Sequence, residues 1–364
     1  MAEPAAVSER EQVVLDRIER ARAKRTRFTD ARITMAHGAG GRASQTLIDG
    51  LLIPALGAPD PSALGDSALL TVAGAEIAVT TDSFVVTPIR FPGGSIGELA
   101  VNGTVNDLAV AGARPEALTL ALILEEGLTA EELGLEVDAI ARAAEAAGVS
   151  VVAGDTKVVE RGHADRMYVT TTGVGRVDPR ARLSPTALRP VDRVHVSGPV
   201  GTHGMAIMLA RGEFELDAEQ RSDTRPLWPM VDAMLEAAGP GLRCLRDATP
   251  GGAASVLNEL ARASGVAMLV REGDVPVEPA VRGAAEILGI DPMYVANEGV
   301  LVAVVAPDAA DAALNAMRAA PGGARAREIG EVRTEPPGMV LVQTAFGGRR
   351  VMDQLVGDPL PRIC

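Results

Sequence analysis

The most constraining feature of the sequence is that two long stretches each alternate between strand-like and helix-like segments. The first runs over residues 31–177 and the second over 190–346. Residues 178–189 lie between them and contain two prolines and three arginines, which is typical of a linker. We therefore predict two domains of mixed α/β (α+β) class, preceded by a charged extension, 1–30, and followed by a mobile tail, 347–364.

Hydrophobic periodicity and end signals give approximate element positions. In the first half, strands are predicted at 77–81, 118–124, 150–153 and 167–174, and helices at 96–111 and 129–147. In the second half, strands are predicted at 194–197, 266–270 and 300–305, and helices at 204–211, 253–264 and 278–288. Sequence alone does not give the order of the strands in a sheet.

Composition excludes several functional classes. No apolar run reaches the roughly 18 residues that span a bilayer, so we expect no membrane segment. The formal charge of −13 argues against a general nucleic-acid binder, which needs cationic side chains on phosphates. Two cysteines cannot build a disulfide framework. We expect a cytoplasmic protein whose cores are aliphatic, because aromatic residues make up only 2%.

Four aspartates in small-residue surroundings are candidate metal ligands. They are Asp66, Asp82, Asp107 and Asp155, and each lies close to glycine, serine or threonine. Carboxylates in such loops suit a hard cation such as Mg²⁺, which prefers oxygen ligands and bridges to phosphates. The alternative is that each aspartate merely caps a helix or turns a loop. Four such residues in one domain count against that alternative without excluding it.

Two further features point to a phosphate-bearing ligand. Residues 37–41 form a glycine-rich loop, with Gly40 and Gly41 before a predicted helix, and backbone N–H groups there can hold phosphate. The loop is neither a Walker A motif nor a dinucleotide fingerprint. Asn102 and Asn106 are four residues apart, so they share one helix face and indicate a polar cavity.

The sequence closes on Pro361-Arg362-Ile363-Cys364. A thiol at such a position can enter a narrow site end-on. This is not a prenylation signal, which needs cysteine four residues from the end. The alternative is an accidental cysteine on a frayed tail. The 17 residues from Gly348 span at most roughly 55–60 Å, enough to carry a thiol-bound group between a partner and an active site.

Taken together, these motifs resemble the HypE family of hydrogenase maturation proteins. The segments that carry the resemblance occur in that family's order, from about residue 33 to 364: residues 37–41, 81–83, 91–94, 106–107, 154–159, 247–249, 251–252, 297–299 and 361–364. The wider superfamily includes aminoimidazole ribonucleotide synthetase, selenophosphate synthetase and thiamine monophosphate kinase.

The resemblance implies a PurM-like fold, with an N-terminal α/β domain that dimerises through its sheet and a C-terminal α+β domain. It also implies a homodimer with ATP and Mg²⁺ as cofactors. HypF would donate a carbamoyl group to Cys364, ATP-dependent dehydration would convert it to a thiocyanate, and the cyanide would pass to iron on the HypC–HypD complex. No nucleic-acid or membrane partner is expected.

By the same resemblance, each candidate residue receives a role. The ATP–Mg²⁺ site would be lined by Gly40, Gly41, Asp66, Asp82, Asn106, Asp107, Asp155 and Lys157, with the four aspartates as metal ligands. Glu298 is the first candidate for removing the amide proton, with a structural carboxylate as the alternative reading, and His37 is a weaker candidate. Pro250 departs from the family, where relatives often carry arginine.

Two other functions remain open from the residues. A sibling enzyme, either a selenophosphate synthetase or a small-molecule kinase, would use a similar ATP site. A selenophosphate synthetase would carry a reactive cysteine and a lysine in its N-terminal glycine-rich segment, which residues 35–42 lack. A non-catalytic thiol carrier would need Cys364 but no carboxylate set.

Overall fold

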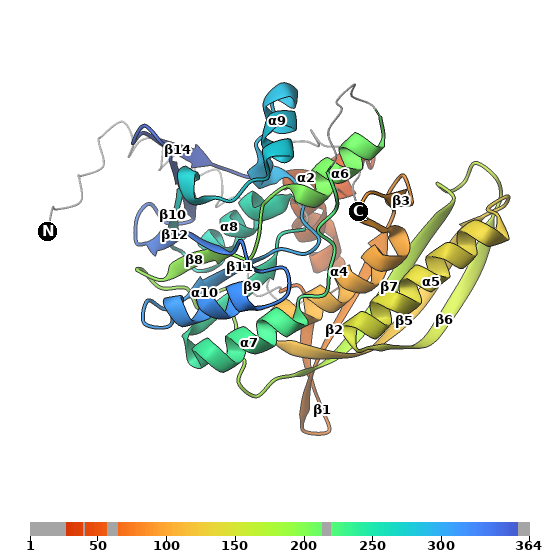
Figure 1. Ribbon diagram of the computed structural model, residues 1–364, viewed down its shortest axis with the longest axis horizontal. Helices are drawn as coiled ribbons and strands as arrows, with labels where there is room; N and C mark the ends of the chain where they lie inside the picture. The colour runs from red at the N-terminus through yellow and green to blue at the C-terminus, as the bar shows by residue number, and fades with distance from the viewer. Residues whose placement is uncertain (1–26, 39–40, 57–64, 213–219, 250, 356–364) are drawn as a thin grey trace, which may run out of the picture.

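Two β-sheets, each covered by helices, make up the described part of the chain (Figure 1). The structure is a computed structural model that describes residues 27–38, 41–56, 65–212, 220–249 and 251–355. Gly40, Pro250, Cys364 and most of the predicted N-terminal extension lie outside these ranges. The mixed α and β fold predicted from the sequence is confirmed.

The first sheet has five strands in the order β1-β2-β7-β5-β6. Its strands are β1 (Ala68–Val72), β2 (Ala75–Phe84), β5 (Ala113–Glu125), β6 (Ser150–Val159) and β7 (Met167–Val177). All pairs are antiparallel except β5 and β6, which are parallel and joined through helix α5 (Ala130–Ala147). Helix α5 begins with a capping box, in which the side chains of Thr129 and Glu132 each accept from the other's backbone N–H. A short hairpin, β3 (Arg90–Phe91) and β4 (Gly94–Ser95), leads into helix α4.

Helix α4 (Ile96–Val110) is the central element of the fold. Thirteen of its 15 residues are buried, and Asp107 is one of the two that are not. A helix that is apolar on all sides has to be covered on all sides. Helix α4 packs on strands β2, β5 and β7 of the first sheet, and its other side contacts helix α7 and strand β9 of the second half (Figure 1). It therefore holds the two halves of the molecule together.

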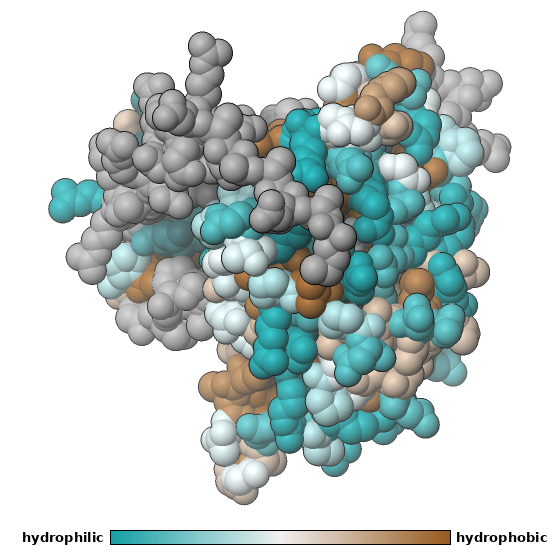
Figure 2. All heavy atoms as spheres, turned by 90° about the vertical axis from the view of Figure 1, so that its left-hand side faces the viewer, coloured by the Kyte–Doolittle hydropathy of each residue, from teal (hydrophilic) through white to brown (hydrophobic). Residues whose placement is uncertain are grey.

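The opposite face of the first sheet has no helix over it in the described chain. Alternation along β2 buries Ala78, Thr80 and Phe84 on the α4 side, while Thr81 and Ser83 point to the open side. Hydroxyl groups form hydrogen bonds across that open face, from Thr81 to Thr172 (3.0 Å) and from Ser83 to Thr170 (2.9 Å). The β1–β2 hairpin projects at the bottom of Figure 1, and the same projection carries hydrophobic side chains in Figure 2.

The second sheet has seven strands in the order β14-β13-β10-β12-β8-β11-β9. Its strands are β8 (Arg193–Val196), β9 (Leu242–Asp247), β10 (Ala267–Arg271), β11 (Leu301–Val305), β12 (Arg327–Arg333), β13 (Met339–Gln343) and β14 (Arg349–Met352). Its helices are α6 (Thr202–Ala210), α7 (Trp228–Ala238), α8 (Gly252–Ala263), α9 (Pro279–Leu288) and α10 (Ala310–Ala319). One apolar cluster includes residues of α8 and the other includes residues of α7 and α10, so the sheet is buried on both faces.

Residues before the first sheet form short helical turns. A 3₁₀ turn spans Met35–Gly38, helix α2 spans Arg42–Leu47, a π turn spans Ile48–Leu52, and helix α3 spans Ile53–Leu56. The predicted linker 178–189 contains neither helix nor strand. No helix in the described ranges is both long enough and apolar enough to cross a bilayer.

Two segments differ from the sequence prediction. Strand β6 continues to Val159, so Asp155 and Lys157 lie within a strand and do not follow its end. The predicted tail from Gly347 contains strand β14, which pairs with β13, and the buried Met352 accepts a hydrogen bond from Asn258 (3.0 Å). Neither segment shows an alternating apolar pattern, and their pairing partners lie far away in sequence. Residues 349–352 of the predicted tail are therefore part of the second sheet.

Candidate active site

Carboxylates from both halves of the molecule meet beside helix α4. Oxygen atoms of Asp66, Asp107 and Asp247 all lie within 4.8 Å of one another. Asp66 precedes strand β1, Asp107 is in the last turn of α4, and Asp247 is the last residue of β9. The packing of α4 against β9 brings them together, so the site is built across the two halves.

Neighbouring hydroxyl groups fix the orientation of these carboxylates. The Thr80 hydroxyl lies 2.7 Å from an Asp107 oxygen and 3.0 Å from the Asp66 carbonyl oxygen. The Thr249 hydroxyl donates to Asp247 at 2.6 Å. Asp82, on β2, interacts electrostatically with the group and shares a hydrogen bond with Asp107. The structure therefore brings together three of the four predicted aspartates, Asp66, Asp82 and Asp107, with Asp247.

One arginine reaches this group, and its charge is shared. Arg246 Nε lies 3.1 Å from an Asp66 oxygen, while its Nη2 lies 2.9 Å from Glu259. The single guanidinium group of Arg246 therefore contacts two carboxylates, those of Asp66 and Glu259, and the other aspartates of the group lie near the first of these. The four aspartates carry more negative charge than this arginine can balance, which leaves the group short of positive charge.

The pKa values of the aspartates reflect that imbalance. Burial raises the pKa of Asp66 to about 8, against the opposing effect of Arg246, and its acidic neighbours raise it further. Burial and the neighbouring carboxylates also hold the pKa of Asp107 well above its usual range. The pKa values of Asp82 and Asp247 are raised, first by burial. Clustered carboxylates with raised pKa values are characteristic of functional sites.

The donor set fits a hard divalent cation. At least three carboxylates can each offer an oxygen to one point, and such oxygens are the ligands that Mg²⁺ prefers. A cation there would supply the positive charge that Arg246 alone does not. The residues that would hold it are Asp66, Asp107 and Asp247, with Asp82 beside them.

Asn106 and Asn102 serve the junction between the halves. The Asn106 side chain donates to the carbonyl oxygens of Arg225 (3.0 Å) and Glu298 (3.1 Å) and accepts from the Leu227 N–H (2.8 Å). Asn102 donates to Thr224 at 3.1 Å. The shared helix face predicted for the two asparagines is confirmed. In the described chain Asn106 joins helix α4 to the second half through three hydrogen bonds.

Glu298 lies at the same junction, and its side chain is almost fully buried. Only 2% of the residue is exposed, and neither carboxyl oxygen has a hydrogen-bond partner in the described chain. Burial first, and then Asp247, Asp223 and Asp82, raise the pKa of Glu298 well above its usual range. Its backbone is fixed by Asp223, which accepts from the N–H groups of Glu298 (3.3 Å) and Gly299 (3.2 Å). A buried, unpartnered carboxyl group needs a ligand or a role, because leaving it unpaired is costly.

Other predicted residues do not join this group within one chain. Asp155 aligns across the sheet with Ala121, Thr170 and Ser83, three strand spacings or roughly 14 Å from β2. Because Ser83 and Thr170 point to the open face, Asp155 and Lys157 also lie on that face, away from Asp82 and the α4 side. They form an exposed ion pair at 2.6 Å.

His37 is held by local contacts. Its Nε2 lies 3.0 Å from Asp30, its Nδ1 lies 3.0 Å from the Thr34 hydroxyl and backbone nitrogen, and its ring packs edge-on against Phe28. Both ring nitrogens therefore have structural partners. Gly41 precedes helix α2 and its carbonyl accepts from Gln45, which fits the predicted loop-to-helix boundary.

Sequence reasoning missed Asp247 as a member of the site. It belongs to the segment 247–249, which carried the resemblance, but no periodicity places the end of β9 against helix α4. The signal that could have found it is its local sequence: Asp247 ends a strand and is followed by threonine and glycines, small residues like those around the other aspartates.

Comparisons with known proteins agree with this geometry. The family models for the N-terminal and C-terminal domains of AIR synthase related proteins match residues 64–177 and 189–342. The carbamoyl dehydratase HypE of Rhodobacter capsulatus is 48% identical over 340 residues, which cover 92% of this chain and 99% of that protein. The chain belongs to the HypE carbamoyl dehydratase family. It is thus an enzyme of a family that matures hydrogenases, and the PurM-like fold implied by the resemblance is confirmed.

Solved structures of HypE proteins are close in fold. A crystal structure of a HypE–HypF complex has a TM-score of 0.81 at 43% identity, covering 85% of this chain and 99% of that chain. A structure of HypE in complex with ATP has a TM-score of 0.77 at 41% identity, covering 92% of this chain and all of that chain. The family assignment made from the motifs is therefore confirmed, and the family is HypE instead of a sibling in the superfamily.

Proposed function

We propose that this chain uses ATP to dehydrate a carbamoyl group carried on Cys364, which yields a thiocyanate. The observation that carries the proposal is the joint presence of a four-aspartate cluster and the buried, unpartnered Glu298 at one junction. The first suits a metal-bound triphosphate and the second suits proton transfer. A relative in this family has been solved in complex with ATP.

The chemistry needs both functions because oxide is a poor leaving group from an amide. The carboxamide oxygen would attack the γ-phosphorus of ATP, so that a C–O–P linkage forms and ADP leaves. The C–O bond would then break with loss of phosphate, while the nitrogen gives up its protons and the C≡N bond forms. Positioning and charge neutralisation provide most of the catalysis of such a phosphoryl transfer.

The carboxylates of this chain supply the positioning. Asp66, Asp107 and Asp247 would hold Mg²⁺, which when bound neutralises the triphosphate charge. Thr80 and Thr249 keep Asp107 and Asp247 in fixed orientations through their hydroxyl contacts. Asp82 stands beside them on β2, and the glycines at positions 40 and 41 would contribute backbone N–H groups to phosphate.

Glu298 is the better candidate for the proton acceptor. Its carboxyl oxygens have no partner in the described chain, whereas both ring nitrogens of His37 are bonded to Asp30 and Thr34. A base has to be ionised, and the pKa of Glu298 is raised partly by Asp247 and Asp82. Neutralising those two aspartates removes this contribution and lowers the pKa of Glu298.

The tail has to reach the junction from strand β14. Residues 353–355 are held by hydrogen bonds, among them Tyr294 to the Asp353 carbonyl oxygen (2.7 Å) and the Arg42 N–H to the Leu355 carbonyl oxygen (3.3 Å). The segment 356–364 that follows spans at most roughly 30 Å when extended. We propose that this segment carries Cys364 between a partner's donor site and the junction at α4.

Mass spectrometry of the tail peptide tests the reaction. The chain is incubated with HypF and carbamoyl phosphate, then with and without ATP. We expect a carbamoyl mass gain on Cys364. Loss of one water should follow only when ATP is added. Carbamoylation without any water loss would support a thiol carrier. ATP turnover that is unchanged by Cys364→Ala, with no carbamoylation, would support a sibling kinase.

We also propose that the chain forms a homodimer through the open face of the first sheet. That open face carries exposed apolar side chains, including Ile123 (38% exposed) and Val174 (37% exposed), and strand β6 forms its edge. Unprotected edge strands and open apolar sheet faces favour association. In such a dimer, Asp155 and Lys157 would act on the nucleotide site of the other copy.

Mixing two inactive variants tests this arrangement. In Asp82→Ala and Lys157→Ala chains mixed to form dimers, half are heterodimers with one intact site in each. We therefore expect recovery of roughly a quarter of the wild-type turnover if Lys157 acts across the interface of a two-fold dimer. No recovery, with heterodimers present by mass, would place Lys157 in the site of its own chain or outside any site.

HypF is the proposed carbamoyl donor, and the HypC–HypD complex is the proposed acceptor of the cyanide. A HypE relative has been solved as a complex with HypF. Pull-down of each partner with the wild-type chain and with Cys364→Ala separates docking from group transfer. We expect docking to survive the substitution and transfer to be lost.

A further inference from the structure

A cavity lies in the second half, away from the carboxylate cluster. It has a volume of about 450 Å³ and lies between helices α9 and α10, the turn at 273–277 and the start of strand β12. Arg327, at its edge, aligns across the sheet with Val196, Val302 and Arg246, so it is three strands or roughly 14 Å from the strand that carries Asp247. The catalytic reaction proposed above makes no use of this cavity.

Four arginines line the cavity, and three of them have no ion pair in the described chain. Arg282, Arg318 and Arg327 are exposed, and among these Arg318 donates only its Nε to the Ala326 carbonyl oxygen (3.1 Å). The fourth, Arg325, is paired with Glu278. Three arginines that line one cavity without a carboxylate partner in the described chain repel one another, and an anion between them would relieve that repulsion.

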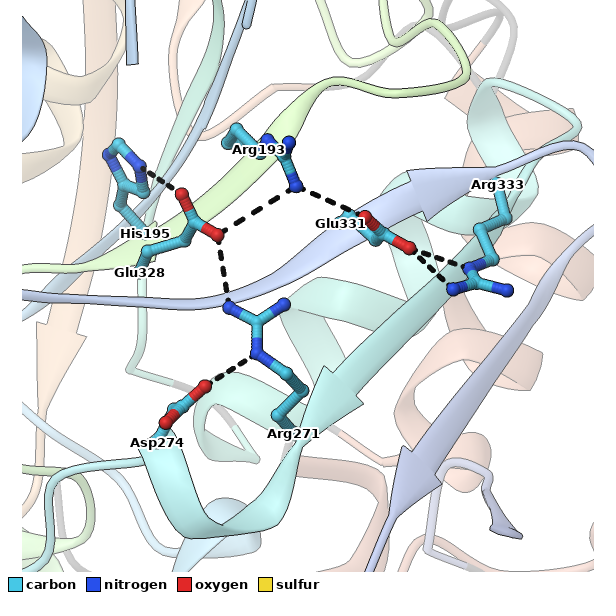
Figure 3. A network of polar contacts seen from close by, with 7 residues as sticks. All are labelled: Arg193, His195, Arg271, Asp274, Glu328, Glu331 and Arg333. Carbon is cyan, nitrogen blue, oxygen red and sulfur yellow. Dashed lines mark hydrogen bonds and ion pairs between the residues drawn. The ribbon is translucent and has the colours of Figure 1, made fainter. Parts of the chain in front are cut away.

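The acidic residues near the cavity are already neutralised by another arginine. Arg271 Nε lies 2.5 Å from Asp274, which is the only acidic residue lining the cavity, and its Nη2 lies 3.0 Å from Glu328 (Figure 3). Glu328 and Glu331 are further shared with Arg193 at 3.9 and 3.1 Å. These carboxylates therefore do not offset the charge of Arg282, Arg318 and Arg327.

We propose that this cavity binds the phosphate group of a small metabolite. Guanidinium groups give paired, charge-assisted hydrogen bonds to phosphate oxygens, and several arginines around one cavity are suited to a group with two negative charges. The volume accommodates a small ligand that carries such a group. The chain as a whole has a formal charge of −13, whereas the lining of this cavity is positively charged. Anions would therefore be attracted to the cavity and repelled by most of the remaining surface. The proposal does not depend on the dehydration reaction.

Site-resolved chemical modification tests the proposal without reference to activity. The whole chain is treated with phenylglyoxal, which modifies arginine, in inorganic phosphate or in chloride of equal ionic strength. Mass spectrometry of peptides then gives the rate at Arg282, Arg327 and Arg142. Arg142 is an exposed arginine on helix α5 without an ion pair in the described chain, and it serves as the internal control. At phosphate ten times above its Kd, we expect about tenfold slower modification of Arg282 and Arg327 by mass action, and no change at Arg142.

Matched variants give the second measurement. Arg282→Gln and Arg327→Gln should each weaken phosphate binding about tenfold, the usual scale for losing a charge-assisted contact, while Arg142→Gln should not. All three side chains are exposed, so we expect the variants to fold. Equal slowing at Arg142, no slowing at the cavity arginines, or phosphate affinity unchanged in Arg282→Gln and Arg327→Gln would each overturn the proposal.

Discussion

Replacing Asp66 by asparagine should stabilise the metal-free protein at neutral pH and abolish its stabilisation by Mg²⁺. Asparagine keeps the shape of the side chain but removes its charge from the cluster of Asp107 and Asp247. The pKa of Asp66 is raised from 3.8 to about 8, mainly by burial. The folded state therefore retains a proton that the unfolded chain loses above pH 3.8. Stability must fall as pH rises between these two values, since the unfolded state binds fewer protons there.

The size of the effect follows from the pKa values. Each pH unit between about 4 and 8 removes roughly 1.36 kcal/mol, so the ceiling at pH 7 is about 4 kcal/mol. The neighbouring carboxylates interact with Asp66, so their titrations overlap and the loss assigned to one residue is smaller. We expect Asp66→Asn to exceed the wild type by about 2 kcal/mol at pH 7 in EDTA and to equal it near pH 4.

Urea unfolding followed by circular dichroism at pH 5, 6, 7 and 8 measures this difference. Asp308→Asn is the matched control, because Asp308 is an exposed aspartate with no ion pair in the described chain. Repeating the series with Mg²⁺ should stabilise the wild type and Asp308→Asn but not Asp66→Asn, because cation binding to the folded state adds stability by mass action. If Asp66→Asn follows Asp308→Asn at every pH, or is less stable than the wild type in EDTA at pH 8, the reasoning about the cluster is wrong.

Three further substitutions have defined outcomes. Asp82→Ala should abolish water loss and leave Cys364 able to accept the carbamoyl group, as judged by the mass of the tail peptide; failure of acceptance in a folded variant would contradict the separation of the two roles. Glu298→Gln should slow water loss by about 10²-fold or more, the usual contribution of a general base, without changing ATP binding measured by calorimetry; an unchanged rate would remove Glu298 from the mechanism. His195→Leu should reduce the loss of unfolding free energy between pH 6.5 and 4. Burial lowers the pKa of His195 from 6.5 to about 4, so the unfolded chain takes up a proton in this range while the folded wild type does not. The wild type should therefore lose up to about 3 kcal/mol more than the variant over this window, measured by urea unfolding, and equal losses would refute the assignment.

Local sequence signals were sufficient for the elements that carry their own pattern. Helix α4 was predicted at 96–111 and spans Ile96–Val110, because apolar residues continue up to the left-handed Gly112. Helix α5 was predicted at 129–147 and spans Ala130–Ala147, because Thr129 and Glu132 form a capping box at its start. Cys244 is buried, and burial raises the pKa of its thiol to about 12, which is typical of an inert structural cysteine.

The sequence prediction missed strand β14 and the second half of strand β6, because both depend on distant pairing partners. Strand β14 has one buried residue, Met352, and its strand pairing comes from β13. Strand β6 contains Gly154, Asp155 and Lys157, residue types that rarely favour strands, and it is ordered by parallel pairing with β5. A local pattern carries no information about such pairing.

The sequence predicted the kind of site, a cluster of aspartates, better than it predicted which aspartates form it. Aspartates beside small residues marked Asp66, Asp82 and Asp107, but Asp247 enters only because helix α4 packs on β9. For Asp155 the local signal was the same, and the sheet register places it on the opposite face. Whether a carboxylate joins a cluster depends on tertiary packing, which residue type and spacing do not encode.

Isotope labelling of the transferred oxygen tests the central claim most directly. Cys364 is loaded with a carbamoyl group labelled with ¹⁸O on its carbonyl oxygen, and ATP and Mg²⁺ are added. If the carboxamide oxygen is phosphorylated before it leaves, the released inorganic phosphate must contain the label. Unlabelled phosphate together with labelled water would mean that the oxygen departs without ever bonding to phosphorus, and the proposed use of ATP would be contradicted.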